Sequence, residues 1–410
     1  MTQSPKRIPK RILVIASRFP LASETFVRTK CAALVALGHD VEILSLSAGD
    51  DAEEDFDRAA QLRARTRVAG IHTPLLQRLV RLPPRVLRLA QTSPRAALGV
   101  LSLRGGWRAY SGQLAAIGAV LGAPRAFDLV CAEFGPAGAI ACDMRRAGLF
   151  DAPIVTAFYG YDVTRALRTQ PHIYDTLFRE GELFLPNSQH LARLLIEHGA
   201  PSARVVVHRL GIDLARFPEV TTTRPLGPTR ALAVGRFVEK KGFGNLLLAL
   251  AAARSRTDCV LRLVGDGPLA PELRSAVRTL KLENRVEFAG WRTHSEVAHD
   301  MAHADFVAVP SVVARDGDVE GVPLVAIEAM ATGLPVLASR HGGLPELIED
   351  GTHGVLCDEG DVPALAEGLV ALSDPTRREL FRRHSRARIV ADYDANALAH
   401  RLVELGCGVA

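Results

Sequence analysis

Two glutamates eight residues apart, Glu320 and Glu328, carry the clearest candidate chemistry in the chain. An apolar run and a Gly/Asp-rich loop come before them, and an Ala-rich run after Pro323 predicts a helix, because proline suits the first turn. Glu320 then precedes this helix and Glu328 lies deeper, on it. The amides of Gly321 and Val322 and the helix dipole would bind an anion between the two carboxylates. Carboxylates that bind hydroxyls beside a phosphate site suit a nucleotide sugar.

A second candidate site follows the apolar run 230–234, which predicts a strand. Gly235 comes directly after it, and a glycine there lets the backbone approach a ligand closely. Arg236 offers a planar fork for phosphate oxygens, and Lys241 offers a point charge. Both cations could therefore bind phosphate, although ordinary surface cations in a strand–helix loop are the alternative interpretation.

The elements that must position these residues alternate between strand and helix along the whole chain. Residues 11–17 predict a first strand, 23–37 a helix and 41–46 a second strand. No Gly-x-Gly-x-x-Gly follows the first strand, which argues against a dinucleotide-dependent dehydrogenase. Two such sets, joined near residue 215, predict two doubly wound parallel sheets with ligands at the carboxyl ends of their strands.

Composition places the chain among ordinary globular proteins. The 410 residues are 48% hydrophobic and 23% charged, and the length predicts two or three domains. Six scattered cysteines without metal-binding spacing indicate free thiols in a reducing compartment. Neither a signal-peptide core nor an apolar run of membrane-spanning length is found. We therefore expect a cytoplasmic protein.

The net charge of +5 is unevenly distributed. The segment 58–127 holds 12 arginines, from Arg58 to Arg125, and no Lys, Asp or Glu. Without acids of its own, it is predicted to need external anions. Anionic lipid at the inner face of the plasma membrane is favoured over nucleic acid, because few aromatic residues are present for base stacking. The alternative is a plain solvated face in an arginine-biased sequence.

The stretch from Pro310 to Gly333 resembles the E-x7-E segment of retaining GT-B glycosyltransferases of the family 4 type, especially the subgroup that builds bacterial exopolysaccharides of the colanic acid and amylovoran kind. FPLASETF and GHDVEIL near the N-terminus resemble the same subgroup. The resemblance implies that Glu320 faces the donor sugar and Glu328 holds the ribose. It also implies that Arg236 and Lys241 grip the donor diphosphate.

Other matching positions carry weaker implications. Gly290 and Trp291 would wrap the nucleobase, although plain packing suits Trp291 nearly as well. Ser23 and Glu24 would lie on the floor of the cleft between the domains, unless Ser23 simply caps the helix that follows.

Two positions near the expected cleft depart from the family pattern, and a nearby aspartate is a further candidate. Tyr159 stands where the family has a histidine that contacts the donor sugar, and Glu133 stands where the subgroup has another histidine. The loss of the histidine at position 159 puts the donor-sugar contact and the identity of the donor sugar in doubt. Asp162 follows in the same loop, and we favour a role in the cleft over a helix cap.

The resemblance implies a GT-B fold of two Rossmann-like domains, 1–214 for the acceptor and 215–392 for the nucleotide sugar. A final helix within 393–410 would cross back to the first domain. The expected reaction is sugar transfer with retention from a UDP- or GDP-linked donor to a glycan acceptor, lipid-linked or an oligosaccharide. No metal or cofactor is expected, and Asp316-Gly-Asp318 is not placed at a strand end to hold a metal. Alternatives are an enzyme with a soluble sugar acceptor, of the sucrose or trehalose synthase type, and an inactive nucleotide-binding protein.

Overall fold

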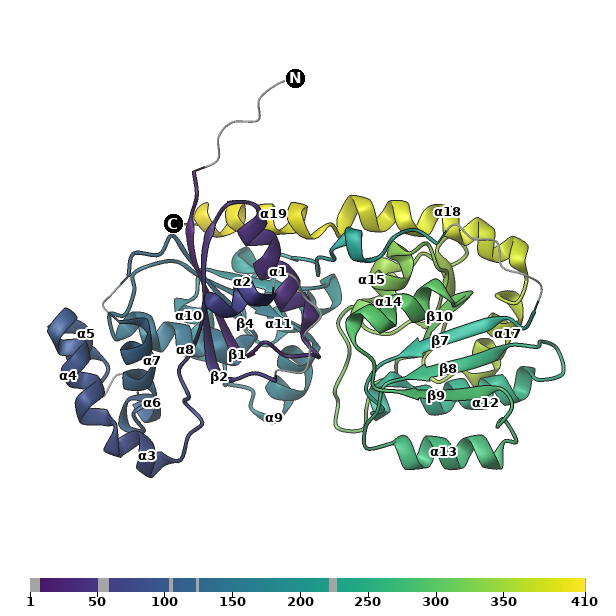
Figure 1. Cartoon of the computed structure of the whole chain (residues 1–410), viewed down its shortest axis with the longest axis horizontal. Coiled ribbons are helices and arrows are strands. Elements are labelled where there is room, and N and C mark those ends of the chain that lie inside the picture. The colour runs from purple at the N-terminus through teal and green to yellow at the C-terminus, as the bar shows by residue number, and fades with distance from the viewer. Residues whose placement is uncertain (1–7, 51–58, 103–105, 123–124, 221–226, 410) are drawn as a thin grey trace, which may run out of the picture.

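Two lobes, each built on a six-stranded parallel sheet, lie side by side along the long axis of the molecule (Figure 1). The computed structural model describes residues 8–50, 59–102, 106–122, 125–220 and 227–409. The strand orders are β3-β2-β1-β4-β5-β6 and β12-β11-β10-β7-β8-β9, and both follow the doubly wound pattern. The predicted fold class is therefore confirmed.

The N-terminal sheet is nearly all apolar because helices cover both of its faces. Its strands are β1 (Arg11–Phe19), β2 (Asp40–Ala48), β3 (Thr66–Val68), β4 (Leu129–Glu133), β5 (Ile154–Phe158) and β6 (Leu183–Pro186). Its helices are α1 (Thr25–Ala36), α2 (Ala59–Ala64), α3 (Leu75–Val80), α4 (Leu82–Thr92), α5 (Pro94–Gly99), α6 (Gly106–Tyr110), α7 (Gln113–Leu121), α8 (Gly135–Arg146), α9 (Leu167–Thr169), α10 (Asp175–Glu180) and α11 (Gln189–Glu197).

The C-terminal lobe repeats this plan around β7–β12, with buried residues on both faces of its sheet. Its strands are β7 (Arg230–Val234), β8 (Val260–Val264), β9 (Val286–Gly290), β10 (Phe306–Val309), β11 (Val336–Ser339) and β12 (Gly354–Cys357). Its helices are α12 (Phe243–Ala253), α13 (Ala270–Thr279), α14 (His294–Ala302), α15 (Leu324–Ala331), α16 (Leu344–Leu347), α17 (Val362–Ala371) and α18 (Pro375–Asp392).

The last helix, α19 (Ala395–Cys407), continues from α18 along one side of the molecule and lies over the N-terminal lobe (Figure 1). Leu402 and Ala399 are buried against α1 and the first sheet, in one cluster with Val27 and Leu34. The final helix thus packs on the first lobe. The exact boundaries at 214, 215 and 392 stay predictions.

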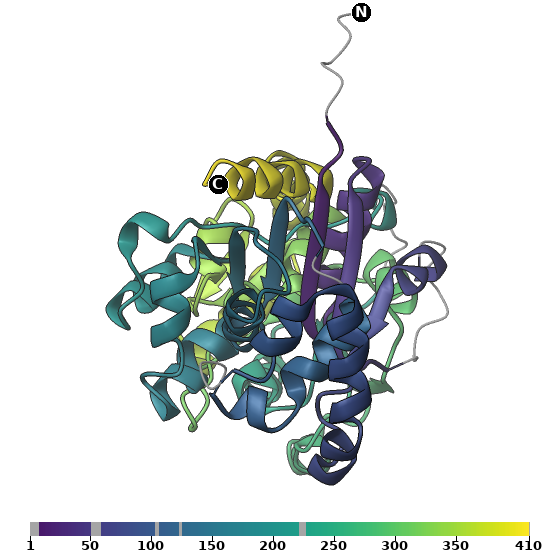
Figure 2. The same ribbon diagram turned by 90° about the vertical axis from the view of Figure 1, so that its left-hand side faces the viewer.

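Helices α3–α6 form the outer end of the N-terminal lobe, the side that faces the viewer in Figure 2. Helix α3 ends and α4 begins at Arg81. Pro83 and Pro84 lie in the first turn of α4, where a backbone N–H has no intrahelical acceptor, so the proline pair is compatible with the start of a helix. Within the described residues, no helix is both long enough and apolar enough to cross a membrane.

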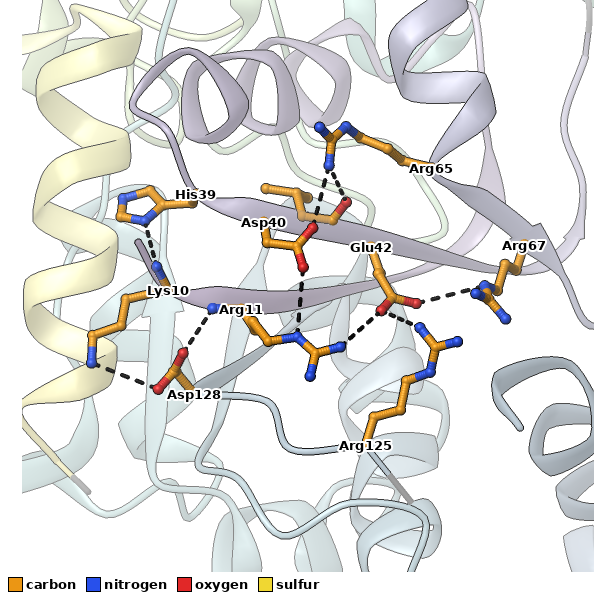
Figure 3. Close-up of polar contacts among 10 residues, drawn as sticks. Lys10, Arg11, His39, Asp40, Glu42, Arg65, Arg67, Arg125 and Asp128 are labelled. Atoms are coloured by element: carbon orange, nitrogen blue, oxygen red, sulfur yellow. Dashed lines mark hydrogen bonds and ion pairs between the residues drawn. The ribbon is translucent and has the colours of Figure 1, made fainter. Parts of the chain in front are cut away.

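The prediction that the arginines of 58–127 need external anions is wrong for part of the segment. Figure 3 shows Arg65, Arg67 and Arg125 beside acids at the amino ends of the strands, and Arg65 pairs with Asp40 at 3.5 Å. Arg67 and Arg125 both contact Glu42. These acids belong to β2, outside the segment, so a count within the segment missed them. Arg58 and Arg104 lie outside the described residues.

Candidate active site

A cavity of about 500 Å³ opens between the lobes at the carboxyl ends of their strands. It gathers most of the site residues that the sequence singles out: Ser23, Glu24, Tyr159, Gly235, Arg236, Trp291, Glu320, Gly321, Val322, Lys241 and Glu328. Gly290 and Asp162 do not line it. Both lobes therefore contribute to one site, as two doubly wound domains facing each other should.

Glu320 lines this cavity and lies between two lysines. Lys241 Nζ is 3.1 Å from Glu320 Oε2, and Lys240 Nζ is 3.3 Å from Oε1. Burial works to raise the pKa of Glu320, but the two ammonium groups outweigh it and hold that pKa at about 2. Lys240 also bonds Asp318 at 2.9 Å. Lys240 was not singled out from the sequence, although its position next to Lys241 in the same loop could have indicated it.

The backbone of Glu320 is held by a buried histidine. The Glu320 amide donates to His341 Nε2 at 3.0 Å, and His341 Nδ1 lies 2.7 Å from Glu359 Oε1. Because Nε2 accepts, Nδ1 carries the proton and donates it to Glu359. His341 is fully buried, so this chain of bonds fixes the loop that presents Glu320.

Arg236 is exposed on the wall of the cavity, directly after β7. No carboxylate of the described residues pairs with its guanidinium, in contrast to Lys240 and Lys241. Gly235 next to it makes room for a side chain, because a Cβ there would lie 3.1 Å from the Lys241 stem. The glycine thus admits Lys241 into the site.

Glu328 is buried one turn inside α15 and reaches the cavity. Its Oε1 is 2.7 Å from His294 Nε2, at the start of α14. His294 Nδ1 also lies 3.2 Å from the Arg216 guanidinium, so Nδ1 accepts and Nε2 donates to Glu328. His294 was not singled out from the sequence, because nothing local links it to a glutamate 34 residues later.

The helix after Glu320 begins one residue later than the sequence analysis placed it. Helix α15 starts at Leu324, and Pro323 is its N-cap residue in an extended conformation. Gly321 and Val322 therefore lie in the loop that leads into the helix, where both line the cavity. A Cβ on Gly321 would lie 2.4 Å from Asn187 of the N-terminal lobe, so glycine here lets the lobes touch.

Of the two residues expected near the nucleobase, Trp291 lines the cavity and Gly290 does not. Trp291 lines the cavity with its side chain 56% exposed, so plain packing does not describe it. Gly290 lies outside the cavity wall, and its carbonyl accepts from the Gly265 amide at 2.8 Å. Its left-handed φ of 72° ends β9 and turns the chain toward Trp291.

Ser23 and Glu24 both line the cavity from the N-terminal lobe. The N-cap residue of α1 is Glu24, without a side-chain cap bond, so the capping interpretation of Ser23 is wrong. No hydrogen bond or ion pair holds the Glu24 carboxyl within the described part of the chain. Burial, with help from Glu133 and Asp50, raises its pKa to about 7.

Tyr159 and Glu133, the two departures from the family pattern, contact each other. Tyr159 Oη donates to Glu133 Oε2 at 2.7 Å, and Lys30 Nζ donates to Glu133 Oε1 at 2.8 Å. Burial and the neighbouring Glu133 raise the pKa of Tyr159 well above its usual value. The cleft role favoured for Asp162 is not what the structure shows, because its buried carboxyl accepts from the Tyr159 amide at 3.2 Å.

Asp316 and Asp318 are each matched to a cation, Arg165 at 3.1 Å for the first and Lys240 for the second. Within the described residues, no three His, Cys, Asp or Glu side chains gather as a metal site requires.

A larger hollow of about 800 Å³ lies in the C-terminal lobe around the first residues of β7 and β9. It contains none of the predicted site residues, and the ion pair of Arg262 and Asp300 lies in its wall.

Solved structures share this architecture over nearly the whole chain. HepE from Anabaena, in complex with UDP-glucose, superposes with a TM-score of 0.68 at 21% identity, over 96% of this chain and 98% of that one. The architecture and the cleft therefore place the chain in the two-lobed GT-B fold class.

Sequence comparison narrows the class to a family. Residues 23–216 match the model described as "Glycosyltransferase Family 4", and 228–375 match "Glycosyl transferases group 1". WcaL of Salmonella typhimurium, named as a colanic acid biosynthesis glycosyltransferase, is 34% identical over 95% of this chain and 97% of its own. The amylovoran biosynthesis glycosyltransferase AmsK of Erwinia amylovora is 34% identical over 88% and 90%. The chain belongs to the family 4 glycosyltransferases, in the exopolysaccharide subgroup.

Proposed function

We propose that this glycosyltransferase moves a sugar, with retention, from a nucleotide diphosphate donor to a glycan of a surface polysaccharide. The observation that carries the proposal is the cavity between the lobes, which is lined by Glu320, by Glu328 and by Arg236, a cation without a carboxylate partner among the described residues. A nucleotide sugar presents hydroxyls at its sugar and its ribose, and negative charge on the diphosphate between them. The two glutamates could accept hydrogen bonds from the hydroxyls, and the arginine could bind the diphosphate.

The costly step is breakage of the bond between the anomeric carbon and the diphosphate oxygen. Charge then builds up on the diphosphate, where Arg236, Lys241 and the amides of residues 321 and 322 would stabilise it. Fixed cations in this position supply the neutralisation that a bound metal gives elsewhere, so we propose no metal or cofactor. The acceptor oxygen bonds the same face of the carbon, and its proton goes to the departing phosphate.

Donor choice can be tested by thermal unfolding with UDP-, GDP- and ADP-sugars. A ligand that binds only the folded protein raises its melting temperature. We expect a shift with the UDP- or GDP-linked sugars, and release of the free nucleotide diphosphate when a glycan acceptor is added. The absence of a shift with every donor would rule out the proposed function.

We further propose a lipid-linked acceptor, reached by docking on anionic membrane through the outer face of α3–α5. Exposed apolar and cationic side chains occur together along this segment: Leu75, Leu76, Leu79, Val80, Arg81, Leu87, Arg88, Arg95 and Leu98. The three arginines pair with no acid of the described residues, and the leucines can enter the headgroup region. This arrangement supports peripheral attachment to the inner face of the plasma membrane.

Co-sedimentation tests the docking face. The chain should pellet with phosphatidylglycerol vesicles at low salt and stay in the supernatant with phosphatidylcholine vesicles. A variant with Arg81, Arg88 and Arg95 changed to glutamine should lose this binding. The matched change of Arg65, Arg67 and Arg125 to glutamine, three arginines that already have acidic partners, should keep most of it. Equal losses in both variants would reject the face.

A further inference from the structure

Three aromatic rings from the N-terminal lobe meet on the wall of the cavity. Phe26, Phe134 and Tyr159 all line it, and Tyr159 lies 4.7 Å, centroid to centroid, from each of the other two. Phe26 and Phe134 are half-buried, and Tyr159 is buried. Together they form an aromatic surface on the N-terminal side of the cleft, which we call the aromatic wall.

Phe134 is held in a backbone conformation that its residue type disfavours. Its φ of 71° and ψ of 149° lie near a region that is essentially restricted to glycine and costs other residues energy. The conformation is fixed by its amide, which donates to the Ala157 carbonyl at 3.1 Å, and by its carbonyl, which accepts from Ala137 at the start of α8. A phenylalanine kept where glycine fits best indicates that the ring is needed in the cleft.

The polar end of the wall is already bonded. Tyr159 Oη donates to Glu133 and accepts from Lys30 at 3.3 Å, so its hydroxyl is satisfied inside the lobe. Glu133 is fully buried, and its two oxygens are shared between Lys30 and Tyr159. The aromatic wall therefore offers ring faces to a ligand, and no donor from Tyr159.

Ring faces of this kind suit one part of a carbohydrate. The face of an aromatic ring carries partial negative charge, and the axial C–H bonds of a pyranose present a matching, weakly positive apolar face. Glu24 lines the same cavity with its carboxyl unoccupied by the described residues, and so can accept from the hydroxyls at the edge of such a sugar. Apolar rings beside one polar group give stacking and orientation together.

We propose that the aromatic wall is the acceptor subsite. A pyranose of the acceptor glycan would stack on Phe134 and Phe26, and one of its hydroxyls would donate a hydrogen bond to the Glu24 carboxylate. This inference rests on the proposed function for its assignment to the acceptor. All three rings belong to the N-terminal lobe, whereas Glu320, Arg236 and Lys241, which would hold the donor, belong to the other. The two sugars would then meet in the middle of the cavity.

Saturation-transfer NMR on the full chain tests this subsite without any donor. The probes are the methyl pyranosides of β-D-glucose, β-D-galactose, α-D-mannose and α-L-fucose at millimolar concentration. In the wild type, at least one probe should be saturated most strongly at the axial C–H protons of one face. Phe134→Gly removes the ring and suits the observed φ, so this variant should fold normally and lose that signal at least five-fold. Tyr110→Ala, an exposed ring remote from the cavity, should leave it unchanged.

Three results would overturn the subsite. The first is axial saturation in Phe134→Gly equal to the wild type, and the second is saturation of no probe in the wild type. The third is a weaker thermal shift of Phe134→Gly with UDP- or GDP-sugars than the wild type gives, because the ring would then touch the donor. A wild type that stabilises with no nucleotide sugar contradicts the proposed function instead, and the glycoside signal separates the two failures.

Discussion

At the scale of single residues, the site depends on how Lys241 and Glu320 share charge. Lys241→Ala removes an ammonium group where charge develops on the departing diphosphate, and it leaves Glu320 with Lys240 as its remaining partner. We expect the transfer rate to fall about 100-fold or more, the scale seen when one charge-stabilising donor is lost. Steady-state release of nucleotide diphosphate measures it. Arg315→Ala, an exposed cation nearby, is the control, and a near-normal rate for Lys241→Ala would remove it from this role.

Asp162 makes a different kind of prediction, about stability and pH. Burial raises its pKa to about 8, whereas an unfolded aspartate loses its proton near 3.8. Between these two values the unfolded state releases a proton that the folded state keeps, so the free energy of unfolding falls as pH rises through this window. Asp162→Asn removes the titrating group and should raise the melting temperature at about pH 8 more than at about pH 5.

Thermal unfolding across this pH range gives the comparison. Asp151→Asn, which changes an exposed carboxyl, should follow the wild type at every pH. A parallel offset of Asp162→Asn at all pH values would mean that its carboxyl does not titrate in this window.

At the scale of elements, local patterns predicted the strands well and their partners poorly. Strand β7 has the bounds that the sequence indicated, because a buried parallel strand is a short apolar run between polar loops. Glu320 likewise precedes α15 and Glu328 lies on it, as the sequence indicated. The hydrogen bonds of Glu328 to His294 and of Glu320 to His341 join residues that are 34 and 21 positions apart, so no local sequence pattern contains them.

The same limit explains the misjudged arginines. Arg65 and Arg67 precede or lie in β3, and their acidic partners stand on β2, which becomes adjacent only when the sheet forms. The short β3 itself was missed, because three residues of mixed polarity carry no readable period.

Helix α11 shows how one element joins the lobes. Glu346 of the C-terminal lobe accepts from the amides of Gln189 and His190 at 2.7 Å each, and Ser188 accepts from Leu191. Glu346→Ala leaves two amides at the helix start without this partner and should cost about 1 kcal/mol, as the loss of a cap does. Denaturant unfolding measures it, with the exposed Glu349→Ala as control. An unchanged midpoint for Glu346→Ala would show that water replaces the carboxylate without cost.

At the scale of the whole molecule, the last helix packs on the core of the first lobe. Leu402 of α19 is 2% exposed and packs in one cluster with residues of α1 and β1, although it follows the entire second lobe in sequence. Leu369 of α17 is equally buried, in the core of the second lobe. These two leucines provide matched deletions, one in each core.

Leu402→Ala should destabilise the N-terminal lobe by about 2 to 5 kcal/mol, the usual cost of such a cavity, and leave the core of the C-terminal lobe intact. Hydrogen exchange measures each lobe separately, because amides lose protection only in the unit that opens more often. We expect faster exchange in β1 and α1 for Leu402→Ala, and in β10 and β11 for Leu369→Ala. The two lobes would then unfold as separate units held together by α18 and α19. Equal acceleration in both lobes for either variant would contradict this, because it requires the two cores to open together.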